Sequence, residues 1–336
     1  MSSQQSRGAG SVDIERAVAL LRAGELVAFP TETVYGLGAD AANAAAVAKI
    51  FAAKGRPADH PLIVHLPLHT PFDIWAREVP AAAALLAEVF WPGPLTMILK
   101  RSPRVSDLVT GGQDTVGLRV PAHPLARELL VAFGSGIAAP SANRFGRISP
   151  TTAAHVRQEL GDRVALILDG GPCPVGIEST IVDLTRPVPA LLRPGAITAQ
   201  EIADVLGLPR LMQPVDDGTG PRVSGSLPSH YAPHTPLRLV AAADLPEEIA
   251  SRLDQGLHVA VLARQARRVF HNRVTWQAIV PDVAGYAHDL YAHLRALDAV
   301  EVNLILVEAP PQSDEWLAVN DRLGRAAAGT AEDEET

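Results

Sequence analysis

The stretch LVAFPTETVYGLG, residues 26–38, decides the fold that we expect for this chain. Residues 26–29 form a short apolar run between a glycine and a proline, which is typical of a buried strand. Polar side chains and glycines follow, and Asn43 is a suitable N-cap for a helix through Phe51. A strand that passes through such a junction into a helix can hold an anion or a small polar ligand. The stretch therefore predicts an α/β arrangement with a candidate ligand site after its first strand.

The glycines at the end of this stretch allow two interpretations. Residues 36–41, GLGADA, fit a loose dinucleotide-binding fingerprint. No acidic residue stands about 20 positions later at the end of a second strand, where a ribose-binding group belongs. Glycines that simply mark a turn explain the same six residues equally well.

Strand and helix patterns interleave along the first two thirds of the chain without strict alternation, which favours an α/β sheet of mixed direction. The expected strands are 26–29, 62–66, 96–100, 115–120, 137–139, 165–169, 180–184 and 190–193. The expected helices are 14–22, 43–51, 81–90, 124–133, 152–160 and 199–206. Further on, strands at 237–240, 259–263 and 303–307 alternate with helices at 246–254, 284–299 and 317–328. This near-regular alternation suggests a second, smaller α/β domain with a parallel sheet.

Proline and glycine concentrate between residues 207 and 236, so we expect an interdomain linker there. The expected organisation is a disordered lead at 1–10, a first domain at 11–206, the linker at 207–236, a C-terminal domain at 237–328 and an acidic tail at 329–336.

The composition narrows the class of protein. With 29 Lys and Arg against 37 Asp and Glu, the formal net charge is -8, so the chain is a poor general binder of polyanions unless basic groups gather locally. The single cysteine, Cys173, excludes an intramolecular disulfide and a thiolate cluster for zinc. No apolar run approaches the ~18–20 residues that span a bilayer, and the first residues do not resemble a signal peptide. A cytoplasmic location is therefore expected.

Two cations straddle a glycine in the segment KGRP, residues 54–57. Lys54 as a point charge and Arg56 through its planar fork can grip a polyphosphate. Cations at a helix C-terminus also interact favourably with the helix dipole. On spacing alone, this structural role is more frequent than phosphate binding. No Walker sequence occurs in the chain, so ATP would need another arrangement.

A third segment, residues 115–121, places Thr115, Gly117 and Arg119 on one face of a strand. Arg119 projecting into a pocket would be a natural receptor for a carboxylate. A surface strand with an isolated arginine explains the spacing equally well.

Hydroxyl and amide side chains follow the strand at 137–139. Ser141 and Asn143 stand at its end, where open α/β sheets bind ligands. Ser149 precedes Pro150 and is predicted to be a helix N-cap. His288 and His293 are five apart on a predicted helix and so do not share a face, and no metal site is expected.

In this order, the motifs resemble the YrdC-like domain of threonylcarbamoyl-AMP synthases. The resemblance covers roughly residues 11–206 and rests on the segments 29–38, 54–57, 91–96, 115–121, 140–143 and 178–183. SHYAP at 229–233 is similar to the linker motif of the long, two-domain members, and 286–291 and 320–323 are similar to their C-terminal domain. The resemblance implies a YrdC-like twisted, mixed open sheet with flanking helices, followed by a smaller Rossmann-like α/β domain.

The resemblance also implies a reaction and a set of site residues. The enzyme would be an L-threonylcarbamoyladenylate synthase, a nucleotidyltransferase that joins L-threonine, bicarbonate and ATP and releases pyrophosphate. L-threonine would be bound by Thr33, His65, Arg119, Ala139 and Ser179, with Arg119 on its carboxylate. ATP would contact Lys54, Arg56, His60, Thr115, Ser141, Asn143, Ser149 and Arg193. The catalytic group would be Lys54, Arg56, Ser141 and Asn143, and Tyr231 would cover the nucleotide as part of a lid. His60 stands where several relatives carry Asn.

The implied chemistry suits these residue types. Adenylyl transfer depends on alignment and on neutralising phosphate charge, for which cations and hydroxyls suffice. Mg²⁺ would enter with ATP and keep most of its waters, so it requires no carboxylate cluster. The product would pass to a downstream tRNA threonylcarbamoyl transferase complex that forms threonylcarbamoyladenosine next to the anticodon. Direct binding of tRNA stays open at this stage.

Three other functions compete. A carbamoyl transferase of the hydrogenase-maturation type has a similar domain, but its cysteine-paired zinc modules do not fit a chain with one cysteine. A module that binds double-stranded RNA does not fit the net acidity and the three lysines. A nicotinamide oxidoreductase rests only on the loose glycine fingerprint.

Overall fold

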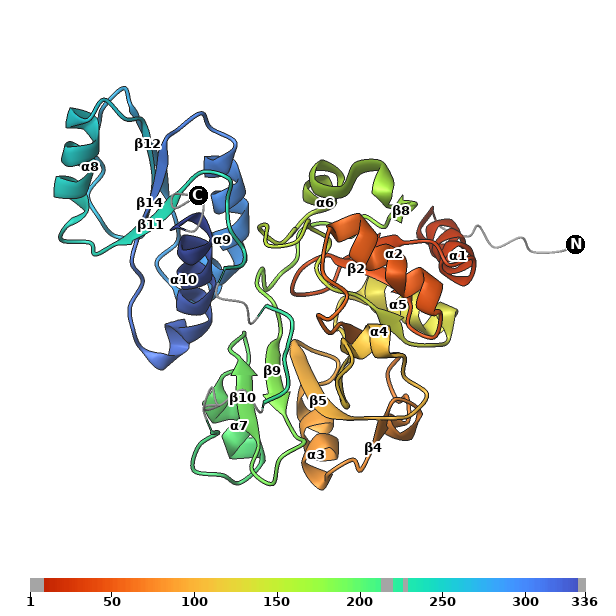
Figure 1. Ribbon diagram of the computed structural model, residues 1–336. Helices are drawn as coiled ribbons and strands as arrows, with labels where there is room; N and C mark the ends of the chain where they lie inside the picture. Colours follow the sequence, from red (N-terminus) through yellow and green to blue (C-terminus); the bar gives the residue numbers. More distant parts are fainter. Residues whose placement is uncertain (1–8, 213–219, 226–228, 332–336) are drawn as a thin grey trace, which may run out of the picture.

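The computed structural model describes residues 9–212, 220–225 and 229–331. In these ranges the chain folds into two α/β units, each with its own sheet (Figure 1). The first unit carries a large mixed sheet with flanking helices, and the second a four-stranded sheet. The expected fold class is therefore confirmed.

The large sheet has ten strands within the described residues, in the order β10-β9-β5-β6-β3-β7-β2-β1-β8, with β4 paired to β5 outside this path. The strands are β1 (Val27–Phe29), β2 (Gly36–Asp40), β3 (Ile63–His65), β4 (Ala76–Arg77), β5 (Leu95–Arg101), β6 (Thr115–Arg119), β7 (Ile137–Ala138), β8 (Leu166–Ile167), β9 (Thr180–Asp183) and β10 (Ala190–Arg193). Parallel pairs such as β3 with β6 and β5 with β9 stand beside antiparallel pairs such as β5 with β6. The sheet is mixed, as predicted.

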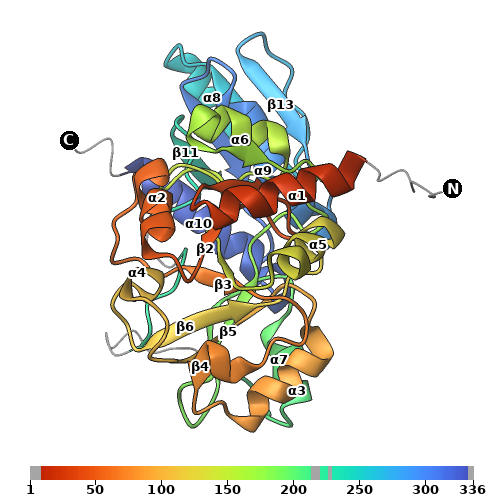
Figure 2. The same ribbon diagram turned by 90° about the vertical axis from the view of Figure 1, so that its right-hand side faces the viewer.

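Helices cover both faces of this sheet. They are α1 (Ala9–Arg22), α2 (Ala44–Lys54), α3 (Ala81–Phe90), α4 (Asp107–Thr110), α5 (Pro124–Phe133), α6 (Ala153–Leu160) and α7 (Ala199–Val205). Successive side chains of β1 point to opposite faces of the sheet. Val27 and Phe29 pack with α1 and α5, while Ala28 packs on the other face in the cluster that contains α2. Figure 2 shows α1 and α5 next to each other.

Capping residues set the bounds of α2 and thereby place two candidate site residues. Asn43 is the N-cap, and its Oδ1 accepts from the backbone of Ala45 at 3.0 Å. Gly55 ends the helix in the left-handed conformation with φ 64°, which glycine adopts without steric cost. Lys54 is therefore the last residue of the helix, and Arg56 follows the cap.

The glycines of residues 36–41 belong to a strand, so both the turn and the nucleotide-loop interpretation were wrong. Strand β2 pairs antiparallel with β1 and with β7. A Cβ on Gly38 would lie 2.8 Å from Cε1 of Phe29 and 2.9 Å from Cγ2 of Ile137. Glycine is thus required here for close packing rather than for a phosphate or a turn.

Other predicted boundaries need correction. Ser149 is not a helix N-cap, because α6 begins later and Thr152 Oγ1 accepts from the backbone of His155 at 3.2 Å. Helix α1 begins at Ala9, earlier than predicted, and so enters the expected lead at 1–10, of which residues 1–8 lie outside the described part. Helix α10 runs past residue 328 into the expected tail, of which 332–336 lie outside. The short elements β4 and α4 were not predicted.

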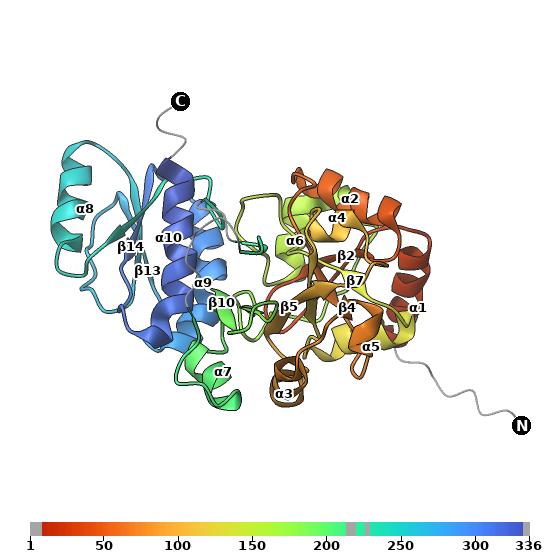
Figure 3. The ribbon, with the colours of Figure 1, turned by 60° about the horizontal axis from the view of Figure 1, so that its bottom comes forward.

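The second unit contains a parallel sheet in the order β11-β14-β12-β13. Its strands are β11 (Leu237–Val240), β12 (Val259–Ala263), β13 (Val274–Ala278) and β14 (Leu304–Glu308), and its helices are α8 (Leu245–Asp254), α9 (Val283–Asp298) and α10 (Leu317–Ala331). The parallel sheet was predicted, but β13 was not. Figures 1 and 3 show α9 and α10 on the side that faces the first unit, with α8 on the far side.

An apolar cluster joins the two units. Val34, Ile148 and Ile177 of the first unit pack in the same cluster as Leu290 of α9 and Leu323 of α10. The second unit therefore shares part of its core with the first. Among the helices of the described ranges, none has both the length and the apolar character required to cross a membrane.

Candidate active site

One cavity of about 50 Å³ lies where the loop after β1, the ends of β3 and β6, the loop after β7 and the linker meet. Nine residues predicted from the sequence line it: Thr33, Arg56, His65, Arg119, Ala139, Ser141, Ser179, Arg193 and Tyr231. A larger groove of about 490 Å³ lies between β10, α7 and the turn at 314–316, and no predicted site residue lines it. The small cavity is therefore the candidate active site.

Arg119, at the end of β6, is buried in an ion pair. Its Nη2 lies 2.7 Å from Oε1 of Glu32 and donates to Oγ1 of Thr33 at 2.9 Å. Its Nε donates to the Gly93 carbonyl at 3.4 Å, and the other oxygen of Glu32 accepts from the backbone of Ala122 at 2.9 Å. The guanidinium group is thus held in one orientation beside the cavity, and its charge is balanced by a carboxylate.

His65, at the end of β3, is a neutral imidazole in the cavity wall. Burial, and then the positive charge of Arg119, lowers the pKa of His65 to about 3. The ring packs edge-on against Phe29, with ring centroids 5.9 Å apart. A neutral imidazole has one donor and one acceptor nitrogen, so it can bind an amine or a hydroxyl without adding charge.

Two arginines reach the cavity and also contact the linker. Arg56 Nη2 donates to the Pro61 carbonyl at 3.0 Å and to Oγ of Ser224 at 3.3 Å. Arg193 Nη1 donates to the Ser224 carbonyl at 2.7 Å, and its Nε and Nη2 donate to the Ser179 carbonyl at 3.1 and 3.0 Å. Both guanidinium groups are therefore bridged by one linker residue.

Lys54 lies behind the cavity wall rather than in it. Its buried Nζ donates to the carbonyl oxygens of Ser141 at 2.6 Å and Asn143 at 2.5 Å. Burial, and then the charge of Arg56, holds the pKa of Lys54 well below its ordinary value. The lysine fixes the loop that carries two other predicted residues.

Five predicted residues lie outside the lining of the cavity: Lys54, His60, Thr115, Asn143 and Ser149. His60 packs edge-on against Phe145, with centroids 5.2 Å apart. Thr115 lines a narrow neighbouring space of about 10 Å³ that shares Ile63 and Ser224 with the cavity. These residues surround the candidate site but do not face its interior here.

Glu178, just before β9, is a buried carboxylate in the cavity wall that the sequence prediction did not select. Ser149 Oγ donates to its Oε1 at 2.6 Å, and Tyr291 OH and Arg322 Nε donate to its Oε2 at 2.9 and 2.8 Å. Burial favours a higher pKa for Glu178, but the charges of Arg322 and Arg193 outweigh it and hold the pKa at about 2. The carboxylate is therefore ionised.

Tyr231 brings the linker into the cavity. Its backbone has φ 62°, which is unusual for a residue other than glycine, and its side chain is 1% exposed. The ring lies against His230 and Tyr291, with centroids 4.2 and 5.8 Å apart, and the guanidinium of Arg322 lies 5.4 Å from its centroid. A Cβ on Gly225 would lie 2.2 Å from the Tyr231 hydroxyl, so the two parts of the linker touch.

Four buried polar atoms of predicted site residues have no hydrogen-bond partner among the described residues: Arg56 Nε, His65 Nδ1, Asn143 Oδ1 and Tyr231 OH. Buried polar groups in folded proteins are nearly always paired. Three of these residues, Arg56, His65 and Tyr231, line the one cavity, which favours a polar ligand as the missing partner.

The charges around the cavity favour an anion. The arginines Arg56, Arg119 and Arg193 of the cavity wall outnumber the carboxylates beside them, Glu32 and Glu178. A local excess of positive charge in a chain of net negative charge attracts anionic ligands to this place. Within the part of the chain that the structure describes, no group of three or more His, Cys, Asp or Glu side chains could hold a metal ion.

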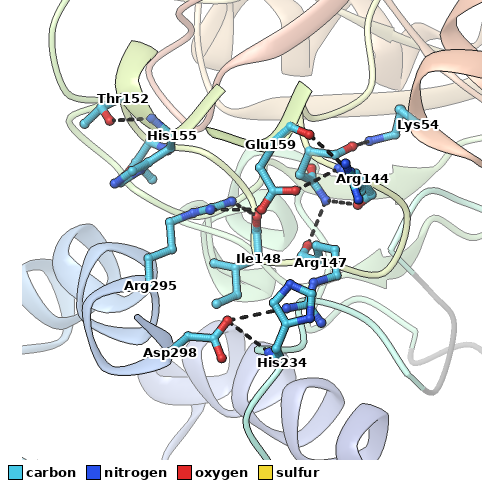
Figure 4. A network of polar contacts seen from close by, with 12 residues as sticks. Lys54, Arg144, Arg147, Ile148, Thr152, His155, Glu159, His234, Arg295 and Asp298 are labelled. Carbon is cyan, nitrogen blue, oxygen red and sulfur yellow. Dashed lines mark hydrogen bonds and ion pairs between the residues drawn. The ribbon is translucent and has the colours of Figure 1, made fainter. Parts of the chain in front are cut away.

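The loop that follows Asn143 is fixed from outside the first unit (Figure 4). Glu159 of α6 accepts from Arg295 Nη1 of α9 at 2.9 Å, and Arg295 Nη2 donates to the Ile148 carbonyl. Asn143 Nδ2 donates to the Arg147 carbonyl at 2.7 Å and thereby closes the loop.

Asp298, at the end of α9, connects this loop to the linker (Figure 4). Its Oδ2 lies 3.4 Å from Arg147 Nη2 and accepts from the backbone of His234 at 2.9 Å. Its Oδ1 accepts from the backbone of Thr235 at 2.8 Å. One carboxylate of the second unit thus positions both a wall loop and the end of the linker.

Among the residues that were not selected from the sequence, Glu178, Ser224 and His230 line the cavity, and Glu32 pairs with Arg119 beside it. The two glutamates directly precede the selected Thr33 and Ser179 in the sequence. An acidic residue next to a buried strand could have indicated a buried carboxylate at the site. Ser224 had no such signal, because only the folded linker brings it to the two arginines.

Two family models match the chain. One, described as telomere recombination, matches residues 19–195. The other, described as the C-terminal domain of threonylcarbamoyl-AMP synthase, matches residues 197–328.

Curated relatives and a solved structure extend these matches over nearly the whole chain. The threonylcarbamoyl-AMP synthase of Pyrococcus abyssi is 40% identical over 328 residues, 94% of this chain and 94% of its own length. That of Bacillus subtilis is 41% identical over 324 residues, 94% of this chain and 93% of its own length. The crystal structure of P. abyssi Sua5 complexed with L-threonine superposes with a TM-score of 0.87 at 39% identity, covering 94% of both chains. This chain belongs to the threonylcarbamoyl-AMP synthase family.

Proposed function

We propose that this enzyme makes threonylcarbamoyl-AMP and pyrophosphate from L-threonine, bicarbonate and ATP. The observation that carries the proposal is the single cavity in which the residues assigned to threonine and to ATP meet, under an excess of cations. The family membership of the chain and the relatives over 94% of its length support the same activity.

The threonine end of the cavity is assigned to Thr33, His65, Arg119, Ala139 and Ser179. Arg119 binds the carboxylate, and its ion pair with Glu32 keeps the guanidinium from turning away. His65, neutral at physiological pH, binds the hydroxyl or the amine. The uncharged imidazole matters for selectivity. An imidazolium ion at this position would be a second cation beside Arg119 and would also bind phosphate.

The nucleotide end is assigned to the residues around Arg56 and Arg193. Both guanidinium groups contact Ser224 of the linker, so a hydroxyl and a carbonyl oxygen stand where phosphate oxygens are to bind. His60, Thr115, Ser141, Asn143 and Ser149 complete the assignment for ATP. Lys54 acts by holding the loop at 141–143 in place.

The linker acts as a lid over the site. A cavity of about 50 Å³ is far below the roughly 300–1,000 Å³ of small-molecule sites, so ATP enters after Ser224 and Tyr231 withdraw. Once the linker closes again, it keeps water from the labile adenylate.

The reaction then proceeds in two steps. The amine of threonine attacks the carbon of bicarbonate, and water leaves, which gives a carbamate. A carbamate oxygen attacks the α-phosphorus of ATP, the bond to the bridging oxygen breaks, and pyrophosphate leaves with its electron pair. The cations stabilise the charge that develops on the phosphate groups. Mg²⁺ enters as part of the MgATP substrate.

The product is a donor for tRNA modification. A mixed anhydride with AMP is an activated acyl group, so a tRNA threonylcarbamoyl transferase consumes it to form threonylcarbamoyladenosine. This chain hands over the adenylate and leaves the transfer to that enzyme.

The test is release of pyrophosphate from MgATP, with L-threonine and bicarbonate each supplied or withheld. We expect release only when both are present, and weaker release with L-serine, since one methyl group discriminates by about 1–3 kcal/mol. Release without threonine would instead favour a carbamoyl transferase. No release, together with binding of double-stranded RNA, would favour the RNA-binding module.

A further inference from the structure

Two side chains of the second unit contact Glu178, a residue of the cavity wall. Arg322 of α10 and Tyr291 of α9 are fully buried, and both donate to the carboxylate of Glu178 in the first unit. Arg322 Nη2 also donates to the Glu178 carbonyl at 3.3 Å. One arginine thus fixes both the side chain and the backbone of a cavity residue.

The position of Glu178 determines the position of its neighbours. Ser179 Oγ lies 2.8 Å from Thr96 Oγ1 and accepts from Arg193 Nη2 at 3.1 Å. Ser149, assigned to ATP, donates to the carboxylate itself. A shift of Glu178 would therefore move residues at the threonine end and at the nucleotide end together.

A buried carboxylate requires compensation, and here most of it comes from the second unit. Of the three side chains that donate to the Glu178 carboxylate, only Ser149 belongs to the first unit. Removing one partner of a buried ion pair leaves an uncompensated charge, whereas removing both charges is often tolerated. Without Arg322, the carboxylate would have to take up a proton, rearrange or admit water.

The same two residues support the lid. Tyr231 packs against the ring of Tyr291, and the guanidinium of Arg322 lies over the Tyr231 ring. The ring of Tyr291 contacts the linker, while its hydroxyl contacts the wall. Loss of the hydroxyl alone therefore separates the effect on the wall from the effect on the lid.

We propose that the C-terminal domain completes the active site, with Arg322 and Tyr291 as positioning residues that hold Glu178 and, through it, the substrate-binding serines. This inference rests on the proposed function, because it concerns the same cavity. It assigns to the second unit a direct role in substrate affinity beyond that of carrying the linker.

The test compares Arg322→Met and Tyr291→Phe in the full chain. The matched control is Arg325→Met, which removes another arginine of α10, whose Nε lies 2.9 Å from Oδ1 of Asp321. The described donors to the Glu178 carboxylate are Ser149, Tyr291 and Arg322. We measure the dissociation constant of L-threonine by calorimetry, the KM for each substrate and kcat from pH 5 to pH 8. Circular dichroism establishes that each variant is folded.

Arg322→Met is expected to weaken threonine binding at least tenfold and to give kcat/KM a new pH dependence between pH 5 and 8. The added change Glu178→Gln should remove that pH dependence and restore thermal stability, which assigns it to this carboxylate. Tyr291→Phe should weaken threonine binding severalfold without shortening the lifetime of the product. Arg325→Met should leave threonine affinity and the pH profile as they are.

Two outcomes would overturn the inference. One is a folded Arg322→Met protein with unchanged threonine affinity and an unchanged pH profile. The other is a control variant that loses affinity as strongly as Arg322→Met, since the effect would then come from general damage to α10. If the unaltered chain bound threonine but released no pyrophosphate, the proposed function would fail while the positioning role stayed testable through the binding constant.

Discussion

At the scale of single residues, Arg119 is paired with Glu32 in the structure and is proposed to bind the threonine carboxylate. Arg119→Ala should raise the threonine requirement about 10- to 100-fold, because a hydrogen bond to a charged group contributes about 1.5–3 kcal/mol. It should also destabilise the fold, because Glu32 stays buried without its partner. Steady-state kinetics and urea denaturation measure the two effects.

The double variant Glu32→Gln, Arg119→Met is the control for Arg119→Ala. It should recover most of the lost stability, since no buried charge is left unpaired, but none of the threonine affinity. Recovery of both would mean that Arg119 is only structural. An unchanged threonine KM in either variant would show that the carboxylate binds elsewhere.

His65 makes the stability of the fold depend on pH. Its pKa is about 3 when folded, lowered first by burial and then by Arg119, against about 6.5 when unfolded. Between these values the unfolded chain binds the proton and the folded chain does not, so this contribution is complete above pH 6.5 and is lost as the pH falls. His65→Gln should therefore lower the slope of the unfolding free energy by about 1.4 kcal/mol per pH unit between pH 4 and 6. Equal slopes in both proteins would refute the buried, neutral imidazole.

At the scale of elements, β2 is the clearest difference between sequence and structure. Gly38→Ala places a methyl group 2.8 Å from the Phe29 ring and should cost about 1–3 kcal/mol of stability. Gly324→Ala in α10 is the matched control, because a Cβ there meets nothing within 4 Å and alanine favours the helix by about 1 kcal/mol. In thermal denaturation, the melting temperature should fall for Gly38→Ala and rise for Gly324→Ala. A neutral Gly38→Ala would contradict the requirement for glycine at this position.

In the proposed function, the linker is the element that protects the product from water. Tyr231→Ala should leave the first unit folded and allow the adenylate to leak or hydrolyse, because a ring of the linker that lines the cavity is lost. The lifetime of the product on the enzyme, followed by rapid quenching, measures this effect. An unchanged rate and an unchanged product lifetime would contradict the role of the linker as a lid.

At the scale of the whole molecule, Asp298 links the second unit to the first. Asp298→Ala should raise the KM for ATP severalfold, because it removes one support of the Arg147 loop and one of the linker end at His234. The control is Asp282→Ala, which removes the N-cap of the same helix at a cost of about 1 kcal/mol without touching the first unit. If both variants lost ATP affinity equally, stability rather than the bridge would explain the effect.

Local signals predicted most of the elements. Asn43 and Gly55 gave α2, and the apolar runs gave β1, β3 and β6, because caps and periodicity act within a few residues. The role of Gly38 depends on Phe29 and Ile137, which the fold alone brings together. Ser149 fits the local pattern of an N-cap but donates instead to Glu178, which is distant in sequence. Tertiary contacts decided these two cases.

The candidate site follows the same division. The motifs selected nine residues that now line one cavity, yet they did not reveal that Glu32 neutralises Arg119. Nor did the motif at 320–323 indicate that Arg322 donates to Glu178 in the cavity wall of the other unit. A sequence motif names a residue type, whereas its partner and its charge balance depend on packing across the molecule.

The central claim is that one cavity joins threonine, bicarbonate and ATP into an adenylate. The most direct measurement is mass spectrometry of the products formed with ¹³C-bicarbonate, L-threonine and MgATP, quenched within seconds. The account predicts an adenylate that carries the threonyl group and one labelled carbon, in an amount equal to the pyrophosphate released. Pyrophosphate without a labelled adenylate, or an adenylate that lacks threonine, would contradict it.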